Sequence, residues 1–291
     1  MLSRLLIAAG VAALAAPATA AADTTLTAGP LKVRGYQLTL LASDGAKDSL
    51  SVVATRRSGG STQTHMWSFA DGVTVKAGGA KPSIALRGGR YGTVKLTLGG
   101  LRGGGRGTVP AGCTGTPGSQ QRGTFAGTLR LTLDRTFFKT VKAARLPGTR
   151  VTGGTLRCDG TSGGQQRGTT LSVTAERGDG GYLMFSAIRD GGGKVTQQAF
   201  VTDAPATVAP ASSAMHMVTA AAPANGFTVA DDLASATVNG AAPFLTGTLA
   251  FTGEAAGGMA SGTVTGNLAV RFDSIGTQSL PADATAMVMR R

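Results

Sequence analysis

The side chains that most often carry out catalysis are scarce in this sequence. Among its 291 residues only two are histidines, His65 and His216, and only two are glutamates. A hydrolytic triad would need one of these histidines to meet a serine and a carboxylate in space. In the segment TQTHMWSFA, strand alternation places His65 on one face with Trp67 and Phe69. Such a face is typical of a core or a pocket wall, so we predict no catalytic residue and regard His65, Trp67 and Phe69 as candidate pocket lining.

Aspartates are more numerous, but their sequence context favours turns over catalysis. The adjacent Asp231 and Asp232 could supply the acid and the base of a glycosidase. Asp-Gly is a strong signal for a hairpin turn, and five of the thirteen aspartates have this context: Asp44, Asp71, Asp159, Asp179 and Asp190. The sequence therefore favours a protein without catalysis, and an exported hydrolase stays as an alternative.

Methionine and histidine occur together in two short segments. These are His65-Met66-Trp67 and Met215-His216-Met217, and soft Cu(I) accepts both thioether and imidazole ligands. In a strand, however, Met215 and Met217 point to one face and His216 to the other, so one strand cannot offer all three to a single ion. We therefore interpret these methionines as core residues and predict no metal site and no cofactor.

The only two cysteines lie at equivalent positions of an internal repeat. The segment CTGTPGSQQRGT at 113–124 returns as CDGTSGGQQRGT at 158–169, with nine of twelve positions identical. In an exported protein two such thiols are expected to pair, since the compartment is oxidising. The sequence thus predicts a disulfide between Cys113 and Cys158.

Positive charge is concentrated in the first two thirds of the chain. The whole sequence has 28 Lys and Arg against 15 Asp and Glu, which gives a net charge of +13. Arginines separated by glycines are typical of segments that wrap polyanions, and two further arginines occupy the same place in the two QQRG repeats. We predict contacts to anionic polymers from Arg87, Arg90, Arg102, Arg106, Arg122 and Arg167.

The first residues have the features of a secretory signal peptide. One positive charge at Arg4 precedes an apolar run and two overlapping A-x-A cleavage sites. We predict a signal peptide over 1–22 and a secreted or extracytoplasmic location. Elsewhere, glycines, threonines and charges interrupt every apolar run, so no transmembrane span is predicted.

Hydrophobic side chains alternate with polar ones along most of the chain. In one example, Leu129, Leu131 and Leu133 share a face while Arg130 lies on the other. This period of two predicts antiparallel strands with one solvated face. We expect an all-β protein made of antiparallel β-sandwich or barrel lobes, two in number, with long Gly-rich loops. A short helix over 135–146 is the one alternative element.

The change in charge along the chain predicts its division into domains. Residues 24–200 hold 24 basic and 8 acidic side chains, whereas residues 201–291 hold 3 and 6. The stretch DAPATVAPASSA at 203–214 is typical of a linker. We predict a basic β domain at 23–202 containing the repeat, a linker at 203–214 and a smaller acidic β domain at 215–291. The alternative is that the last part completes one single sheet system.

Taken together, these features predict an exported, non-catalytic β-rich protein. Its expected partners are extracellular or envelope polyanions, bound through the basic N-terminal part. A lipocalin-like carrier of an apolar small molecule is the second interpretation, and an exported hydrolase is the third.

Overall fold

The computed structural model describes most of the chain after the predicted signal peptide. The described residues are 24–87, 92–106, 113–116, 118–133, 141–153, 156–158, 168–203, 211, 213–240, 243–280 and 284–290. They form antiparallel strands almost throughout, with one short 3-10 turn, η1 (Ala224–Gly226). The prediction of an all-β protein is confirmed, while the predicted signal peptide at 1–22 lies outside the described residues. No helix in the described part is long and apolar enough to cross a membrane.

The N-terminal half of the sheet begins with a four-stranded meander. It consists of β1 (Thr24–Val33), β2 (Tyr36–Asp44), β3 (Ser49–Ser58) and β4 (Ser61–Phe69). Five further strands follow and pair in sequence order: β5 (Val73–Lys76), β6 (Ser83–Leu86), β7 (Gly92–Arg106), β9 (Ser119–Leu131) and β10 (Val141–Thr152). The last of them, β10, pairs with β1, so the second group of strands joins the first strand of the meander.

The C-terminal half repeats this strand order. Its meander consists of β12 (Gly168–Glu176), β13 (Tyr182–Asp190), β14 (Val195–Thr202) and β15 (Ser213–Ala222). The second group is β16 (Phe227–Val229), β17 (Ser235–Asn239), β18 (Leu245–Ala256), β19 (Met259–Phe272) and β21 (Thr285–Arg290). Here β21 pairs with β12 as β10 pairs with β1, and the short β20 (Gly276–Ser279) pairs with the end of β19.

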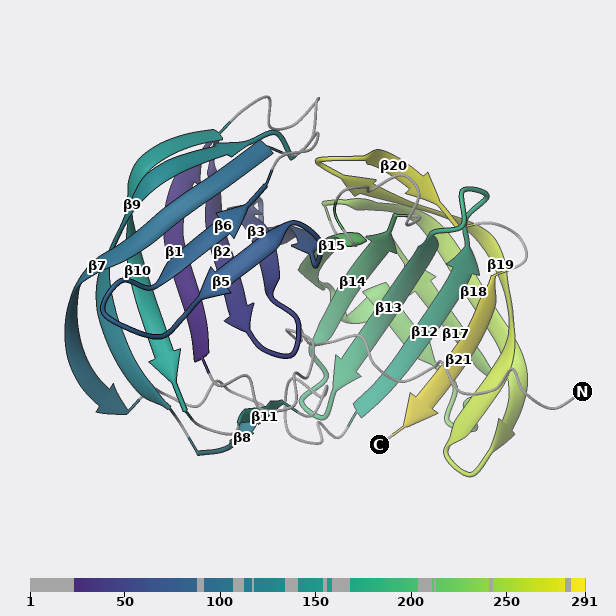
Figure 1. Cartoon of the computed structure of the whole chain (residues 1–291). Helices are drawn as coiled ribbons and strands as arrows, with labels where there is room; N and C mark the ends of the chain where they lie inside the picture. Colours follow the sequence, from purple (N-terminus) through teal and green to yellow (C-terminus); the bar gives the residue numbers. More distant parts are fainter. Residues whose placement is uncertain are drawn as a thin grey trace, which may run out of the picture.

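The two halves are joined edge to edge. Strand β4, the last of the first meander, pairs antiparallel with β15, the last of the second, and this makes one sheet of 19 strands. Figure 1 shows the two groups of strands side by side with β15 between them. Because equivalent strands meet, their pairing has an approximate two-fold character. His65 and His216 are directly opposite each other in it.

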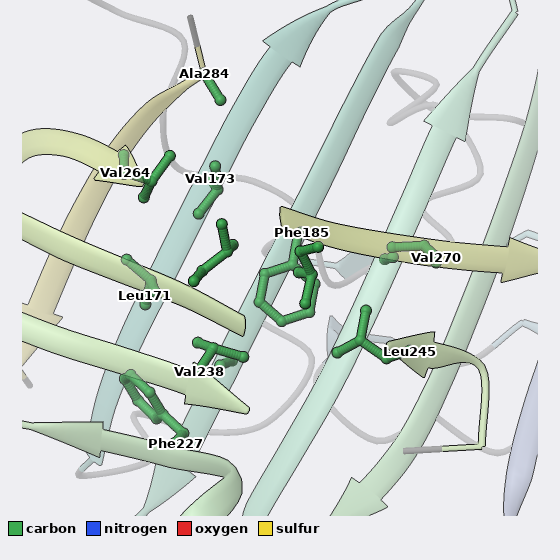
Figure 2. Packing of buried hydrophobic residues seen from close by; sticks show 14 of the residues in the cluster. Leu171, Val173, Phe185, Phe227, Val238, Leu245, Val264, Val270 and Ala284 are labelled. Carbon is green, nitrogen blue, oxygen red and sulfur yellow. The ribbon is translucent and has the colours of Figure 1, made fainter. Parts of the chain in front are cut away.

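Each half has its own hydrophobic core, formed by the inward residues of alternating strands. The first core contains buried residues between Leu26 and Leu146, together with Ala211 and Ala214. The second contains residues between Leu171 and Val288, and Figure 2 shows Phe185 and Phe227 packed among its aliphatic side chains. Apart from Ala211 and Ala214, the two cores therefore divide the chain between residues 146 and 171. The predicted linker at 203–214 instead connects β14 and β15, which pair from Val195 to Thr202, so the domain boundary there stays a prediction.

Two sequence interpretations differ from the structure. The alternative helix over 135–146 is wrong from residue 141 onward, because β10 begins there and pairs on both sides, with β9 and β1. Long-range pairing outweighs the local helical pattern. The interpretation of Met66, Met215 and Met217 as core residues is also wrong, since all three are half-buried and belong to neither core.

A separate pair of short strands carries the two cysteines. These strands are β8 (Cys113–Gly115) and β11 (Leu156–Cys158), and their register places Cys113 directly opposite Cys158. The side chains of both cysteines lie outside the described part of the structure. The disulfide therefore stays a prediction, now with a backbone register that suits it.

Candidate functional site

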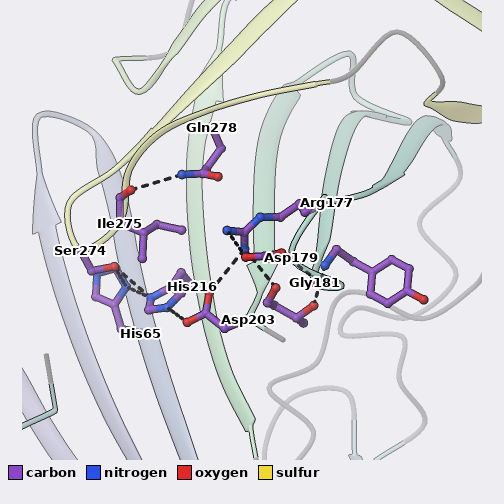
Figure 3. A network of polar contacts seen from close by, with 11 residues as sticks. His65, Arg177, Asp179, Gly181, Asp203, His216, Ser274, Ile275 and Gln278 are labelled. Carbon is purple, nitrogen blue, oxygen red and sulfur yellow. Dashed lines mark hydrogen bonds and ion pairs between the residues drawn. The ribbon is translucent and has the colours of Figure 1, made fainter. Parts of the chain in front are cut away.

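A group of buried and half-buried polar side chains lies where the two halves meet. His65 of β4 and His216 of β15 are 0 % and 2 % exposed, and their Nδ1 atoms are 3.0 Å apart. Ser274, in the turn between β19 and β20, places its Oγ 3.1 Å from His65 Nδ1 and 2.9 Å from His216 Nδ1. Asp203 follows β14 and lies on the other side of His216 (Figure 3). We call His65, His216, Ser274 and Asp203 the junction cluster.

The hydrogen bonds of His216 define the direction in which it can move a proton. Its Nε2 lies 3.3 Å from Asp203 Oδ2, and because a carboxylate only accepts, Nε2 is the donor. When only Nε2 carries a proton, the Nδ1 of His216 presents a lone pair to Ser274 and His65. Burial alone would raise the pKa of Asp203, but hydrogen bonds and charge from His216 and Arg177 hold this pKa below its usual value.

His65 is held in its neutral form. Burial, followed by the neighbouring His216 and Arg56, lowers the pKa of His65 to about 3. Aromatic rings surround the imidazole, since its centroid lies 5.8 Å from that of Tyr36 and 6.3 Å from that of Trp67. A neutral imidazole in this position can share one proton with His216 and Ser274 without placing a charge in the core.

The turn between β19 and β20 ties the C-terminal half to the N-terminal half. The Tyr36 hydroxyl donates to Asp273 Oδ2 at 2.6 Å, and Arg56 forms an ion pair with the same oxygen. The Arg56 guanidinium lies 4.9 Å above the Tyr36 ring. Burial and the neighbouring Asp273 raise the pKa of Tyr36, so its phenol stays protonated and donates. The contacts of Asp273 with Tyr36 and Arg56 therefore hold the neighbouring Ser274 in the junction cluster.

The chain from Ser274 through His216 to Asp203 has the connectivity of a Ser-His-Asp relay. The ring nitrogens are exchanged relative to the common arrangement, since Nδ1 faces the serine and Nε2 faces the carboxylate. Ser274 is 9 % exposed, which leaves its hydroxyl largely covered in this state of the protein. In the described part of the chain, no three His, Cys, Asp or Glu side chains are grouped as metal ligands. The hydrogen bonds among Ser274, His216 and Asp203 suit proton transfer.

A second candidate site is an exposed basic surface on the N-terminal half. Buried inward residues, such as Leu96 on β7 and Leu129 on β9, alternate along each strand with residues that face solvent. Register places Arg102 opposite Arg122. We call the six exposed outward cations on β7, β9 and β10 the basic face: Lys95, Arg102, Arg122, Arg130, Lys142 and Arg145.

The basic face has no negative charge in its own strands. Strands β7, β9 and β10 contain no Asp or Glu, and neither do their neighbours β6 and β1. None of the six cations forms an ion pair with another described residue. The described charged side chains on the outward surface of these three strands are therefore all positive.

The six arginines predicted to contact polyanions do not all lie on the basic face. Arg102 and Arg122 belong to the basic face, Arg106 is exposed at the end of β7, and Arg87 is exposed after β6. Arg90 and Arg167 lie outside the described residues. The predicted contacts did not include Lys95, Arg130, Lys142 and Arg145, although strand alternation had placed Arg130 on the polar face of its strand.

The three residues predicted to line a pocket lie on the inner face of β4. Trp67 and Phe69 are part of the first core, and His65 belongs to the junction cluster. Asp203 and Ser274 were not singled out from the sequence. Ser274 lies 209 residues from His65 in the chain, so no local pattern could have linked them.

Comparison with known proteins gives limited similarity. No family model matches the chain, and no curated protein matches it. Among solved structures, a candidate AttH from Nitrosomonas europaea is 11% identical, with a TM-score of 0.23 and 91% of each chain covered. Kievitone hydratase from Nectria haematococca is 9% identical, with a TM-score of 0.26, covering 94% of this chain and 91% of that one. At these scores neither structure assigns a function to this protein.

Proposed function

We propose that this protein binds anionic polymers through its basic face. The observation that carries the proposal is the set of six exposed cations on three adjacent strands that contain no carboxylate. Like charges on one surface repel each other and destabilise the fold slightly, and a bound polyanion relieves that repulsion. Guanidinium groups also pair with phosphate, sulfate or carboxylate groups through two parallel hydrogen bonds.

The layout of the cations suits an extended partner. Adjacent strands are about 4.8 Å apart and alternate residues of one strand about 7 Å apart, so the six charges cover a broad surface patch. Arg130 is opposite Lys142 in one cross-strand row, and Arg122 is opposite Arg102 in another. Because the six cations lie on the outward faces of strands, we expect them to contact the anionic groups of the polymer and to bind by charge, without sequence preference.

A pair of charge-matched variants tests this proposal. In the first, all six residues of the basic face are changed to Gln. In the control, six exposed cations elsewhere are changed to Gln: Lys32, Lys47, Arg57, Lys76, Lys81 and Lys194. Both variants lose the same formal charge. We expect the basic-face variant to elute from heparin at clearly lower salt than the control, because only it loses the clustered charges.

Two results would contradict the proposal. If both variants elute together below the wild type, retention reflects net charge alone. If both elute with the wild type, the cations of the basic face are only solvated. Circular dichroism of each variant confirms that the sheet is retained, since all twelve positions are exposed.

A second candidate function is hydrolysis, which the Ser274–His216–Asp203 relay favours. In this proposal Ser274 is the nucleophile, His216 accepts its proton through Nδ1, and Asp203 orients His216. A fluorophosphonate probe tests it, because such probes label serines activated by a neighbouring base. We expect labelling at Ser274 that is lost in Ser274→Ala and in His216→Gln. An unlabelled wild-type protein would contradict a nucleophilic role.

A further inference from the structure

The outer face of the junction between the two halves carries a group of thioethers. Met66 of β4 is directly opposite Met215 of β15, and Met217 lies two residues further along β15. All three methionines are half-buried. The adjacent residues His65 and His216 are buried on the opposite face of the sheet. The sheet therefore separates an imidazole pair on its inner side from a methionine group on its outer side.

The register brings the three sulfur atoms within reach of one point. Directly opposite residues, such as Met66 and Met215, have Cβ atoms about 5 Å apart. Met217 is about 7 Å from each of them, since it lies diagonally across from Met66 and two residues along the strand from Met215. A methionine side chain is unbranched and has three rotatable bonds, so its sulfur can swing over several ångströms. Three such side chains from two paired strands can converge above the sheet without moving the backbone.

The surroundings of this group are uncharged and partly apolar. Cross-strand neighbours on the same face are Val53 beside Met66 and Phe200 beside Met217. Met184 of β13 lies opposite Phe200 and adds a fourth thioether at the edge of the group. Such a site offers no carboxylate, imidazole or thiolate. It therefore disfavours Zn²⁺, which binds those ligands, and Mg²⁺ and Ca²⁺, which bind oxygen.

We propose that Met66, Met215 and Met217 form a binding site for Cu(I). Thioether sulfur is a soft, neutral ligand and selects the soft cuprous ion among biological metals. Phe200, half-buried next to Met217, would shield one side of the ion from water. The ion keeps its single positive charge, because the ligands are neutral and lose no proton on binding.

Silver(I) allows the site to be located by a redox-inert probe. In full-length protein with ¹³C-methyl-labelled methionines, we expect Ag(I) to shift the methyl resonances of Met66, Met215 and Met217 together. Met287 and Met289 of β21 are also half-buried and outward, and Met259 lies opposite Met289 in the same register as the proposed site. The cross-strand neighbours of this second group are Thr170, Ser172 and Ser261, and Met259 is 49 % exposed. Because this group lacks the cover that Phe200 gives Met217, its resonances serve as the internal control and should not move. Unchanged resonances at the three sites, or equal shifts at all methionines, would overturn the proposal.

Competition with the chromogenic chelator bicinchoninate, under anaerobic conditions, then measures Cu(I) itself. The triple variant M66L, M215L and M217L keeps the side-chain size but removes the sulfurs, and we expect it to lose one bound equivalent of Cu(I). The matched control M287L and M289L should bind as the wild type does. Loss of binding in both variants, or in neither, would contradict a site at these three residues. Binding of Cu(I) by the cysteines is distinguished because both variants retain Cys113 and Cys158.

Discussion

A single hydrogen-bonded group joins residues that are far apart in the chain. His65 and His216 approach within 3.0 Å, and Ser274 bridges them from a third segment. Each of these groups would be costly to bury alone, and together they satisfy one another. The residue types were visible in the sequence, but the meeting of His65, His216 and Ser274 depends on the pairing of β4 with β15, which no local pattern encodes.

The pH dependence of stability follows from the environment of His65. Its pKa is lowered to about 3 in the folded protein, against an ordinary value of 6.5. The unfolded chain therefore binds a proton more readily than the folded one between these values, so stability is fully present above pH 6.5 and falls toward pH 3. We expect the free energy of unfolding to decrease over this range by up to about 1.4 kcal/mol per pH unit from this group.

Urea denaturation at a series of pH values measures this effect. His65→Gln removes the titrating group, so the variant should be less stable at pH 7 but should lose less stability on acidification. Parallel curves for the variant and the wild type would show that His65 does not control the pH dependence.

Strand alternation was the most reliable signal for the elements. The predicted faces of Leu129, Leu131 and Leu133 and of the intervening Arg130 agree with the burial of these residues in β9 and just after it. The prediction of a helix up to residue 146 was wrong because β10 pairs there with β9 and β1. A local sequence pattern contains no information about such distant partner strands. The charged side of β9 was visible in the pattern at Arg130, whereas the pattern over β10 indicated a helix. The pattern also gave no sign that β7, β9 and β10 are neighbours.

Pairing of β8 with β11 sharpens the disulfide prediction. Directly opposite residues of an antiparallel pair have Cα atoms about 4.5 to 5.5 Å apart, which is within the range that a disulfide requires. With Cys113 opposite Cys158, we expect unreduced protein to show no alkylated thiol by mass spectrometry. Closing this loop should stabilise the fold by about 3 to 4 kcal/mol, so reduction should lower the urea midpoint. Two alkylated cysteines in the unreduced protein would exclude the bond.

At the scale of the whole molecule, the fold consists of two halves with the same strand order. The 12-residue sequence repeat does not follow this duplication, because its copies lead into β9 and β12, which occupy different places in the two halves. The charge change at 203–214 predicted one boundary, whereas the cores divide between Leu146 and Leu171. The two divisions lead to different expectations for truncated chains.

Two fragments decide between these divisions. The fragment 24–202 contains β12 to β14 without β15 and β21, so it would expose Leu171 and Phe185 of the second core. From the arrangement of the cores we expect this fragment to aggregate, and the fragment 24–153 to remain soluble with Trp67 shielded from solvent. Tryptophan fluorescence and size-exclusion chromatography measure both properties. A soluble, cooperatively unfolding 24–202 fragment would support the boundary predicted from charge instead.

The salt dependence of polyanion binding tests whether the basic face is a binding surface. Affinity for a fluorescent heparin fragment is measured by anisotropy across a range of salt concentrations for the wild type, the basic-face variant and its charge-matched control. Each lost ionic contact should lower the slope of log affinity against log salt by about 0.7 to 0.9. We predict a clearly flatter slope for the basic-face variant and a slope close to the wild type for the control. Equal slopes for the two variants would contradict a binding surface on β7, β9 and β10.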